Sequence, residues 1–231
     1  QGLELIAEKR LFPELDYIFK HALTQEVAYN SLLQKRRKEI HEKIGEAIEL
    51  LYPNRLEEYF ELLAYHYSRS DDASKALDYL DRANQKSVKL NAMEEANSYF
   101  DEAMKLLDNQ PETESTQQRR ISLLVNQWIV FWLLFRVPEY FELMKEHEPF
   151  AVKVADPKLL SAFYARLGMC EWVSGPLEES IKTLTKAAKI WEDPENVEEV
   201  SFRNMYLIWN YLYKGDYDQA IAFKNVVVRL M

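Results

Sequence analysis

Apolar residues recur every three or four positions through most of this chain, which is the spacing of one face of an α-helix. In residues 56–69, leucine, alanine and aromatic side chains follow this period. The other segments with this helical pattern are 73–90, 92–107, 117–135, 158–173, 177–191, 200–213 and 217–231. Pro138 opens a further helix, which we expect to kink or break at Pro149 because proline cannot donate to the carbonyl four residues before it. The pattern therefore predicts an all-α chain.

A turn signal is repeated between these helices. At residues 214–221 a helix ends at Gly215, Asp216 caps the next helix, and small Ala220 follows. A similar segment surrounds Gly175, 40 residues earlier, and a looser one covers residues 70–77. Turns at near-constant spacing between amphipathic helices are typical of stacked helical hairpins.

Small residues recur at matching intervals on the predicted helices. Ala64, Ala76 and Ala83 are spaced by 12 and 7 residues, and a second group repeats both spacings: Gly168, Ser180 and Ala187. Ala96 and Ala103 repeat the interval of 7. Small side chains at these offsets let helices approach closely, as in tetratricopeptide (TPR) repeats, whose period is about 34 residues.

The period here is longer than that of consensus repeats. The second-helix markers are 45, 39 and 40 residues apart: Ala96, Phe141, Ser180 and Ala220. We therefore expect longer helices and a wider, right-handed superhelix. Bulky Phe141 stands at a small position, so the third hairpin departs from the pattern.

Five hairpins follow from this pattern, at residues 36–69, 73–107, 117–154, 158–191 and 200–231. The alternative takes 73–90 as the second helix of a hairpin, as its alanines suggest. We prefer pairing 73–90 with 92–107, because an odd helix would leave an apolar stripe unburied. The predicted fold is a TPR-like helical-hairpin solenoid over residues 53–231.

The first 52 residues differ from the rest. Residues 3–8 suggest the end of a helix, and 11–13 and 17–20 suggest the strands of a small hairpin. A helix capped by Thr24 follows, and then one over residues 40–52.

Part of this segment resembles a known family. The residues that carry the resemblance are Tyr17-Ile18-Phe19-Lys20-His21-Ala22-Leu23-Thr24-Gln25-Glu26-Val27-Ala28-Tyr29, Leu32-Leu33 and Arg36-Arg37-Lys38-Glu39-Ile40-His41. They resemble a segment of large bacterial signalling proteins, which carry a class III adenylate/guanylate cyclase or kinase domain, a STAND-type ATPase module, a winged-helix-like piece and TPR repeats. The resemblance implies that residues 1–52 are a winged-helix-like remnant with a linking helix. It also implies that the catalytic domains lie upstream. Since the chain starts at Gln1 and stops inside an apolar helix, we expect a fragment of a longer protein.

Composition narrows the classes of partner and compartment. The 231 residues are 48% hydrophobic and carry a net charge of −9, which disfavours nucleic acid and anionic membranes as partners. The most apolar run, 128–137, is shorter than the roughly 20 residues of a membrane span. A single cysteine, Cys170, fits a reducing compartment, so we expect a cytoplasmic protein with a packed thiol.

No pattern of catalysis is present in the sequence. It has no glycine-rich phosphate loop and no Gly-x-Ser-x-Gly. The histidines lack metal-ligand spacing: His21, His41, His66 and His147. We therefore predict no enzymatic activity for this chain, no cofactor and no metal.

Two groups of residues are candidates for binding. The first is basic: Lys35, Arg36, Arg37 and Lys38. It could contact phosphate of DNA or nucleotide, but the favoured alternative is a solvated helix start or a charged joint, since DNA binders make more phosphate contacts.

The second group is aromatic: Trp128, Trp132, Tyr164, Trp172, Tyr206 and Trp209. All lie on predicted first helices of hairpins, which line the concave face of such a solenoid. Aromatic anchors are typical of peptide-binding grooves. The alternative is that they form the core between repeats.

The predicted function is a non-catalytic sensor or docking arm of a multidomain signalling ATPase or nucleotide cyclase. Its partner would be a protein or peptide in the concave face, or the parent's own ATPase domain. The alternative is the arm of a STAND-type transcription regulator that reads DNA elsewhere in its chain.

Overall fold

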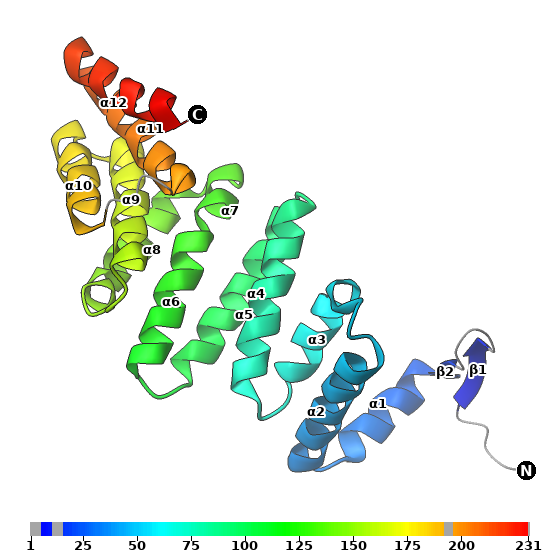
Figure 1. Cartoon of the computed structure of the whole chain (residues 1–231). Coiled ribbons are helices and arrows are strands. Elements are labelled where there is room, and N and C mark those ends of the chain that lie inside the picture. Colours follow the sequence, from blue (N-terminus) through cyan, green and yellow to red (C-terminus); the bar gives the residue numbers. More distant parts are fainter. Residues whose placement is uncertain (1–5, 11–15, 192–195, 231) are drawn as a thin grey trace, which may run out of the picture. The chain divides into compact units, whose positions relative to one another are not determined.

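A computed structural model describes residues 6–10, 16–191 and 196–230 and is almost entirely helical (Figure 1). The chain divides into two compact units, Gln1–Leu80 and Asp81–Met231. This division falls inside helix α4 (Ala73–Lys89). The predicted domain boundary after residue 52 stays a prediction.

The first unit begins with a β-hairpin. Strands β1 (Ile6–Arg10) and β2 (Asp16–Phe19) pair antiparallel, with Ile6 opposite Phe19. The predicted helix end at 3–8 is therefore wrong over residues 6–8, where the backbone joins a ladder. The strand predicted at 11–13 lies outside the described residues.

Four helical segments follow in the first unit, before α4: α1 (Ala22–Ser31), α2 (Gln34–Leu51), the 3₁₀ helix η1 (Leu56–Tyr59) and α3 (Phe60–Tyr67). Thr24 is inside α1, so its prediction as the N-cap is wrong; His21 holds that position. Helix α2 starts earlier than predicted and includes the basic cluster.

Close packing in the first unit centres on Tyr67. A Cβ on Gly45 of α2 would lie 2.6 Å from the Tyr67 ring, so only glycine leaves room for it. Glu49 accepts hydrogen bonds from the hydroxyls of Tyr67 and Tyr79, at 2.8 and 2.6 Å, and pairs with Lys75 at 2.7 Å. One carboxylate of α2 thus joins α3 to the start of α4.

The second unit holds the rest of α4 and eight further helices of the described ranges. These are α5 (Met93–Asp108), α6 (Glu114–Asn126), α7 (Trp128–Leu133), α8 (Val137–Ala151), α9 (Pro157–Ser174), α10 (Leu177–Ile190), α11 (Val197–Lys214) and α12 (Tyr217–Leu230). Helices α9 and α10 form one hairpin, and α11 and α12 form another. The prediction of an all-α helical-repeat fold is confirmed.

The small residues make the close contacts that their spacing predicted. A Cβ on Gly168 of α9 would lie 2.7 Å from Cγ of Leu184 on α10. Ser180 is fully buried and donates to the Gly168 carbonyl at 2.7 Å. Asn210 of α11 donates to the same hydroxyl at 2.9 Å, so the two hairpins are joined by one buried hydrogen-bonded chain.

The turn at Gly215 has the predicted geometry. Gly215 adopts φ 79°, the left-handed conformation that glycine accepts without strain. The Asp216 carboxylate accepts from the backbone N–H of Gln219 at 3.2 Å and caps α12.

Two predictions in the middle of the chain are wrong. Residues 117–135 do not form one helix, because the backbone breaks at buried Gln127, whose side-chain oxygen accepts from Asn84 at 2.8 Å. Helix α8 continues past Pro149 to Ala151, so the predicted break is wrong, and the alternative of a kink stays a prediction. Close to the C-terminal end of α8, proline removes only the one hydrogen bond that its missing N–H would have donated.

The preferred pairing of α4 with α5 gains support from a buried contact. The Asn84 side chain donates to the Ala96 carbonyl of α5 at 2.7 Å. Both residues belong to the second unit.

Candidate functional site

Four of the six predicted aromatic residues lie in one continuous ring network. Trp128 of α7 meets Phe202 of α11 with ring centroids 4.9 Å apart, and Phe202 lies 5.0 Å from Tyr206. Trp172 of α9 lies 5.5 Å from Tyr206. The network ends on α11, where Trp172 is 6.5 Å from Trp209 and 6.2 Å from Tyr213.

We call this set the aromatic strip; its members are Trp128, Trp172, Phe202, Tyr206, Trp209 and Tyr213. The sequence prediction missed Phe202 and Tyr213. Both follow the helical spacing that already links Tyr206 with Trp209, because i, i+4 and i, i+7 positions share one face. Extending the Tyr206–Trp209 stripe in both directions would have found them.

The other two predicted residues are not members of the strip. Tyr164 is 2% exposed and its ring lies under the Lys186 ammonium of α10, with 3.5 Å from Nζ to the ring centroid. It therefore faces the partner helix of its own hairpin. Trp132 is half-buried on α7.

The strip changes from core to surface along its length. Tyr206 is 3% exposed, whereas Trp209 is 45% and Tyr213 68% exposed. Trp128 and Trp172 are half-buried. Apolar side chains beside the exposed end are also open to solvent: Val173, Met205 and Leu212. A partner could contact this end, while the other end serves as core.

A partly buried ion pair lies at the inner end of the strip. The Arg166 guanidinium of α9 binds Glu199 of α11 through two hydrogen bonds of 2.7 and 2.6 Å. The same guanidinium lies 3.9 Å from the Phe202 ring centroid. Such a pair, with its charge also on an aromatic face, fixes α11 against α9.

Burial shifts the pKa of two titratable groups at the buried end of the strip. Burial raises the pKa of Tyr206 to about 12, and the neighbouring Cys170 thiol adds to this shift. Burial also raises the pKa of Cys170 itself, followed by the effect of Glu171. The thiol is fully buried, as expected from the sequence, and a thiol held protonated is a poor nucleophile.

The basic cluster lies in the first turns of α2 and is largely engaged within the first unit. Arg36 pairs with Glu39 at 2.9 Å, and Lys38 pairs with Asp71 at 2.6 Å. Arg37 donates to the carbonyls of Leu32 and Asn30, both at 3.0 Å. Lys35 is exposed. These bonds fit the charged-joint alternative, and phosphate contact stays a prediction.

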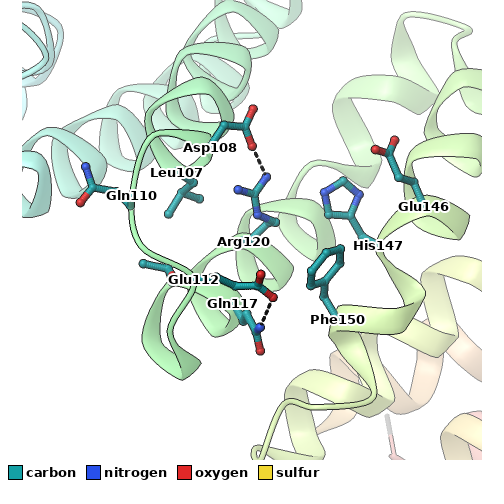
Figure 2. Close-up of a pocket in the computed structure, with 10 residues that line it drawn as sticks. Leu107, Asp108, Gln110, Glu112, Gln117, Arg120, Glu146, His147 and Phe150 are labelled. Atoms are coloured by element: carbon teal, nitrogen blue, oxygen red, sulfur yellow. Dashed lines mark hydrogen bonds and ion pairs between the residues drawn. The ribbon is translucent and has the colours of Figure 1, made fainter.

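A groove between α5, α6 and α8 was not predicted from the sequence (Figure 2). Two adjoining cavities, of 380 and 450 Å³, share Asp108, Arg120, Glu146 and His147 in their walls. In Figure 2, Arg120 and His147 extend toward the same space from α6 and α8. Arg120 pairs with Asp108 at 2.8 Å. These residues are scattered through the sequence, so only the fold brings them together.

Two further findings concern metals and membranes. Within residues 6–10, 16–191 and 196–230, no three His, Cys, Asp or Glu side chains are grouped so as to hold a metal ion. Among the helices of the same ranges, none is long and apolar enough to span a membrane.

Comparison with known structures supports the fold. BtubC (BKLC) from P. vanneervenii matches with a TM-score of 0.59 and 13% identity, over 86% of this chain and 91% of that one. TPR-like repeats of a kinesin light chain from Podosopora anserina match with a TM-score of 0.57 and 12% identity, over 86% and 96%. YrrB, a TPR protein with an unusual peptide-binding site, matches with a TM-score of 0.50 and 14% identity, over 91% and 93%. At these identities the likeness shows the fold alone.

No family model matches the chain, and no curated protein matches it. The winged-helix-like remnant and the cyclase or STAND parent therefore stay predictions from the resemblance of residues 17–41.

Proposed function

We propose that the chain is a non-catalytic protein-interaction arm that takes a peptide or protein segment on the exposed end of the aromatic strip. The observation that carries this proposal is the continuity of the strip. Trp209 and Tyr213 are open to solvent, yet they are held by Trp172, whose ring packs on buried Tyr206. Aromatic side chains that are already fixed lose little conformational entropy on binding.

The finer proposal concerns the parent protein. The arm belongs to a multidomain signalling ATPase or nucleotide cyclase, where a bound partner shifts activity by favouring one arrangement of arm and ATPase. Its support is the resemblance of the first 52 residues. YrrB, described as having a peptide-binding site, supports a peptide as the class of partner. The competing proposal, an arm of a STAND-type transcription regulator, differs only in domains outside this chain.

A pull-down from lysate of the source organism tests the proposed surface. The bait is the full 231-residue chain, and the test variant is Trp209→Ala/Tyr213→Ala. The matched control is Tyr217→Ala/Ile221→Ala, two exposed side chains on the neighbouring helix α12. A partner that the control retains and the test variant loses supports the proposal. Equal capture by all three baits contradicts it.

A further inference from the structure

The groove between α5, α6 and α8 has an excess of negative charge. Its two cavities are lined by five carboxylates, and by three cations: Lys105, Arg120 and Arg136. The carboxylates are Asp101, Asp108, Glu112, Glu139 and Glu146. The groove is formed by elements other than α9 and α11, which carry most of the aromatic strip.

Two of the three cations are already neutralised inside the groove. Arg120 pairs with Asp108 at 2.8 Å, and Arg136 pairs with Glu139 at 2.6 Å. Of the other three carboxylates, Asp101 has both Arg136 and Lys105 near it, and Glu112 and Glu146 add two further negative charges. Asp101 accepts from Asn97 at 3.0 Å. Glu112 accepts from Gln117 at 2.6 Å, a hydrogen bond that Figure 2 shows. Neither of these amide donors carries a positive charge.

Asp101 lies on the exposed side of α5, and neighbouring atoms still desolvate part of its carboxylate. Burial raises its pKa, although Arg136, Lys105 and the Asn97 hydrogen bond act in the opposite direction. A partly desolvated carboxylate of this kind gains from a further cation close by. Glu146, exposed on α8, contributes a second negative charge to the cavity that contains Asp101.

Apolar surface lies beside these charges. Met104 and Leu143 line the same cavity as Asp101 and are half-buried, and Phe150 is half-buried in the adjoining cavity. Along α5 the groove runs from Phe100 to Asp108, which is about 12 Å at 1.5 Å per residue. An extended chain of about four residues covers that length.

We propose that this groove binds a basic, extended segment of a partner protein. A lysine or arginine of the segment lies against Asp101 and Glu146, and an apolar side chain next to it packs on Met104 and Leu143. The carboxylate excess excludes an acidic occupant, and the apolar wall distinguishes the groove from a merely charged surface. This is a second interaction surface, independent of the aromatic strip.

Isothermal titration of the full chain at low salt tests the proposal. The probe is an acetylated and amidated hexapeptide of alternating lysine and leucine. Two comparison peptides replace lysine by glutamate, or leucine by serine. We expect the lysine–leucine peptide to bind, the glutamate peptide not to bind, and the serine peptide to bind more weakly.

A matched pair of variants separates the groove from the general negative charge of the chain. Asp101→Asn/Glu146→Gln removes two charges in the groove, and Asp218→Asn/Glu198→Gln removes the same two charge types from exposed positions on α12 and α11. The groove variant should bind the lysine–leucine peptide about tenfold more weakly, and the control within about twofold of the unmodified chain. Equal losses in both variants, absence of binding, or equal binding of the glutamate peptide would each overturn the proposal.

Discussion

The hairpins α9–α10 and α11–α12 have the same antiparallel arrangement but very different burial. Every residue from 161 to 171 of α9 is buried, whereas on α12 only Ala220 is buried between 217 and 229. Helix α9 packs against α6, α8, α10 and α11. Two tryptophans one hairpin apart, Trp172 and Trp209, accordingly differ in exposure although both belong to the strip. Neighbouring helices, and not residue type, decide whether an aromatic side chain is core or surface.

The partly buried ion pair of Arg166 and Glu199 should have the largest effect on stability. We expect Arg166→Met to lower the free energy of unfolding by about 3 kcal/mol, because it leaves the Glu199 carboxylate without its partner between α9 and α11. Urea unfolding measures the change. Lys182→Met, which removes one partner of an exposed pair with Glu179, should change it by less than about 0.5 kcal/mol.

The same experiment has an internal check. The double variant Arg166→Met/Glu199→Gln should recover more than half of the loss, since it removes the uncompensated charge. A double variant as unstable as Arg166→Met would show that packing on Phe202, and not the charge, is responsible.

Gly168 tests the close approach within the tighter hairpin. Gly168→Ala places a Cβ 2.7 Å from Leu184 Cγ and 3.3 Å from its backbone nitrogen. We expect a loss of about 2 kcal/mol from overpacking, measured by thermal or urea unfolding. An unchanged stability would mean that α9 and α10 separate readily, contrary to the hydrogen bond from Ser180 to the Gly168 carbonyl.

A substitution of Gly215 tests the more exposed hairpin, α11–α12, where glycine is favoured by the backbone conformation and not by close packing. A Cβ there meets nothing within 4 Å, but the backbone has φ 79°. Gly215→Ala should cost about 1 kcal/mol through strain alone, and Gly215→Asn less, because asparagine tolerates the left-handed conformation. Equal losses for alanine and asparagine would contradict this explanation.

We expect the smallest effect on stability from a pair of histidines in the first unit. His41 and His66 are hydrogen-bonded through their Nδ1 atoms at 2.9 Å. Burial, then His41, then Arg69 lower the pKa of His66 from 6.5 to about 4, and burial followed by Arg69 lowers that of His41. The folded chain therefore binds fewer protons than the unfolded chain between these values, and stability falls as the pH drops from 6.5 toward 4.

We expect this loss to be no more than about 1 kcal/mol at pH 5, because His66 is only half-buried and its ring is partly screened by solvent. Unfolding measured at pH 7 and pH 5 checks it. His66→Gln should flatten the pH dependence, whereas the exposed His21→Gln should leave it unchanged. A steeper loss in His66→Gln would assign the effect to other groups.

Helix positions and close contacts could be predicted from the sequence because both depend on local spacing. The intervals of 12 and 7 residues located Gly168, Ser180 and Ala187, all of which are buried between α9 and α10. The break at Gln127 was not predicted, and the residue there is buried with its side chain bonded to Asn84, 43 residues away. The spacing of apolar residues along a helix gives no information about a partner so far away in the sequence.

The candidate surfaces show the same limit. Four aromatic residues chosen for their place on predicted first helices belong to the strip, but that choice could not show that Tyr164 faces Lys186 and not Trp172. The groove of Asp101 and Glu146 left no signal at all, since its carboxylates come from helices that meet only in the folded chain.

Site-specific photocrosslinking tests the central claim, that the exposed end of the aromatic strip is a working surface, most directly. A benzophenone side chain at Leu212, beside Trp209 and Tyr213, and another at Ile221 on α12 would be compared in the 231-residue chain mixed with lysate of the source organism. Both positions are exposed, at 39% and 54%. The proposed function predicts a crosslink from position 212, to a partner protein or to the parent's ATPase domain, that Trp209→Ala/Tyr213→Ala abolishes. The same products from both positions, or products that survive the double variant, would contradict it.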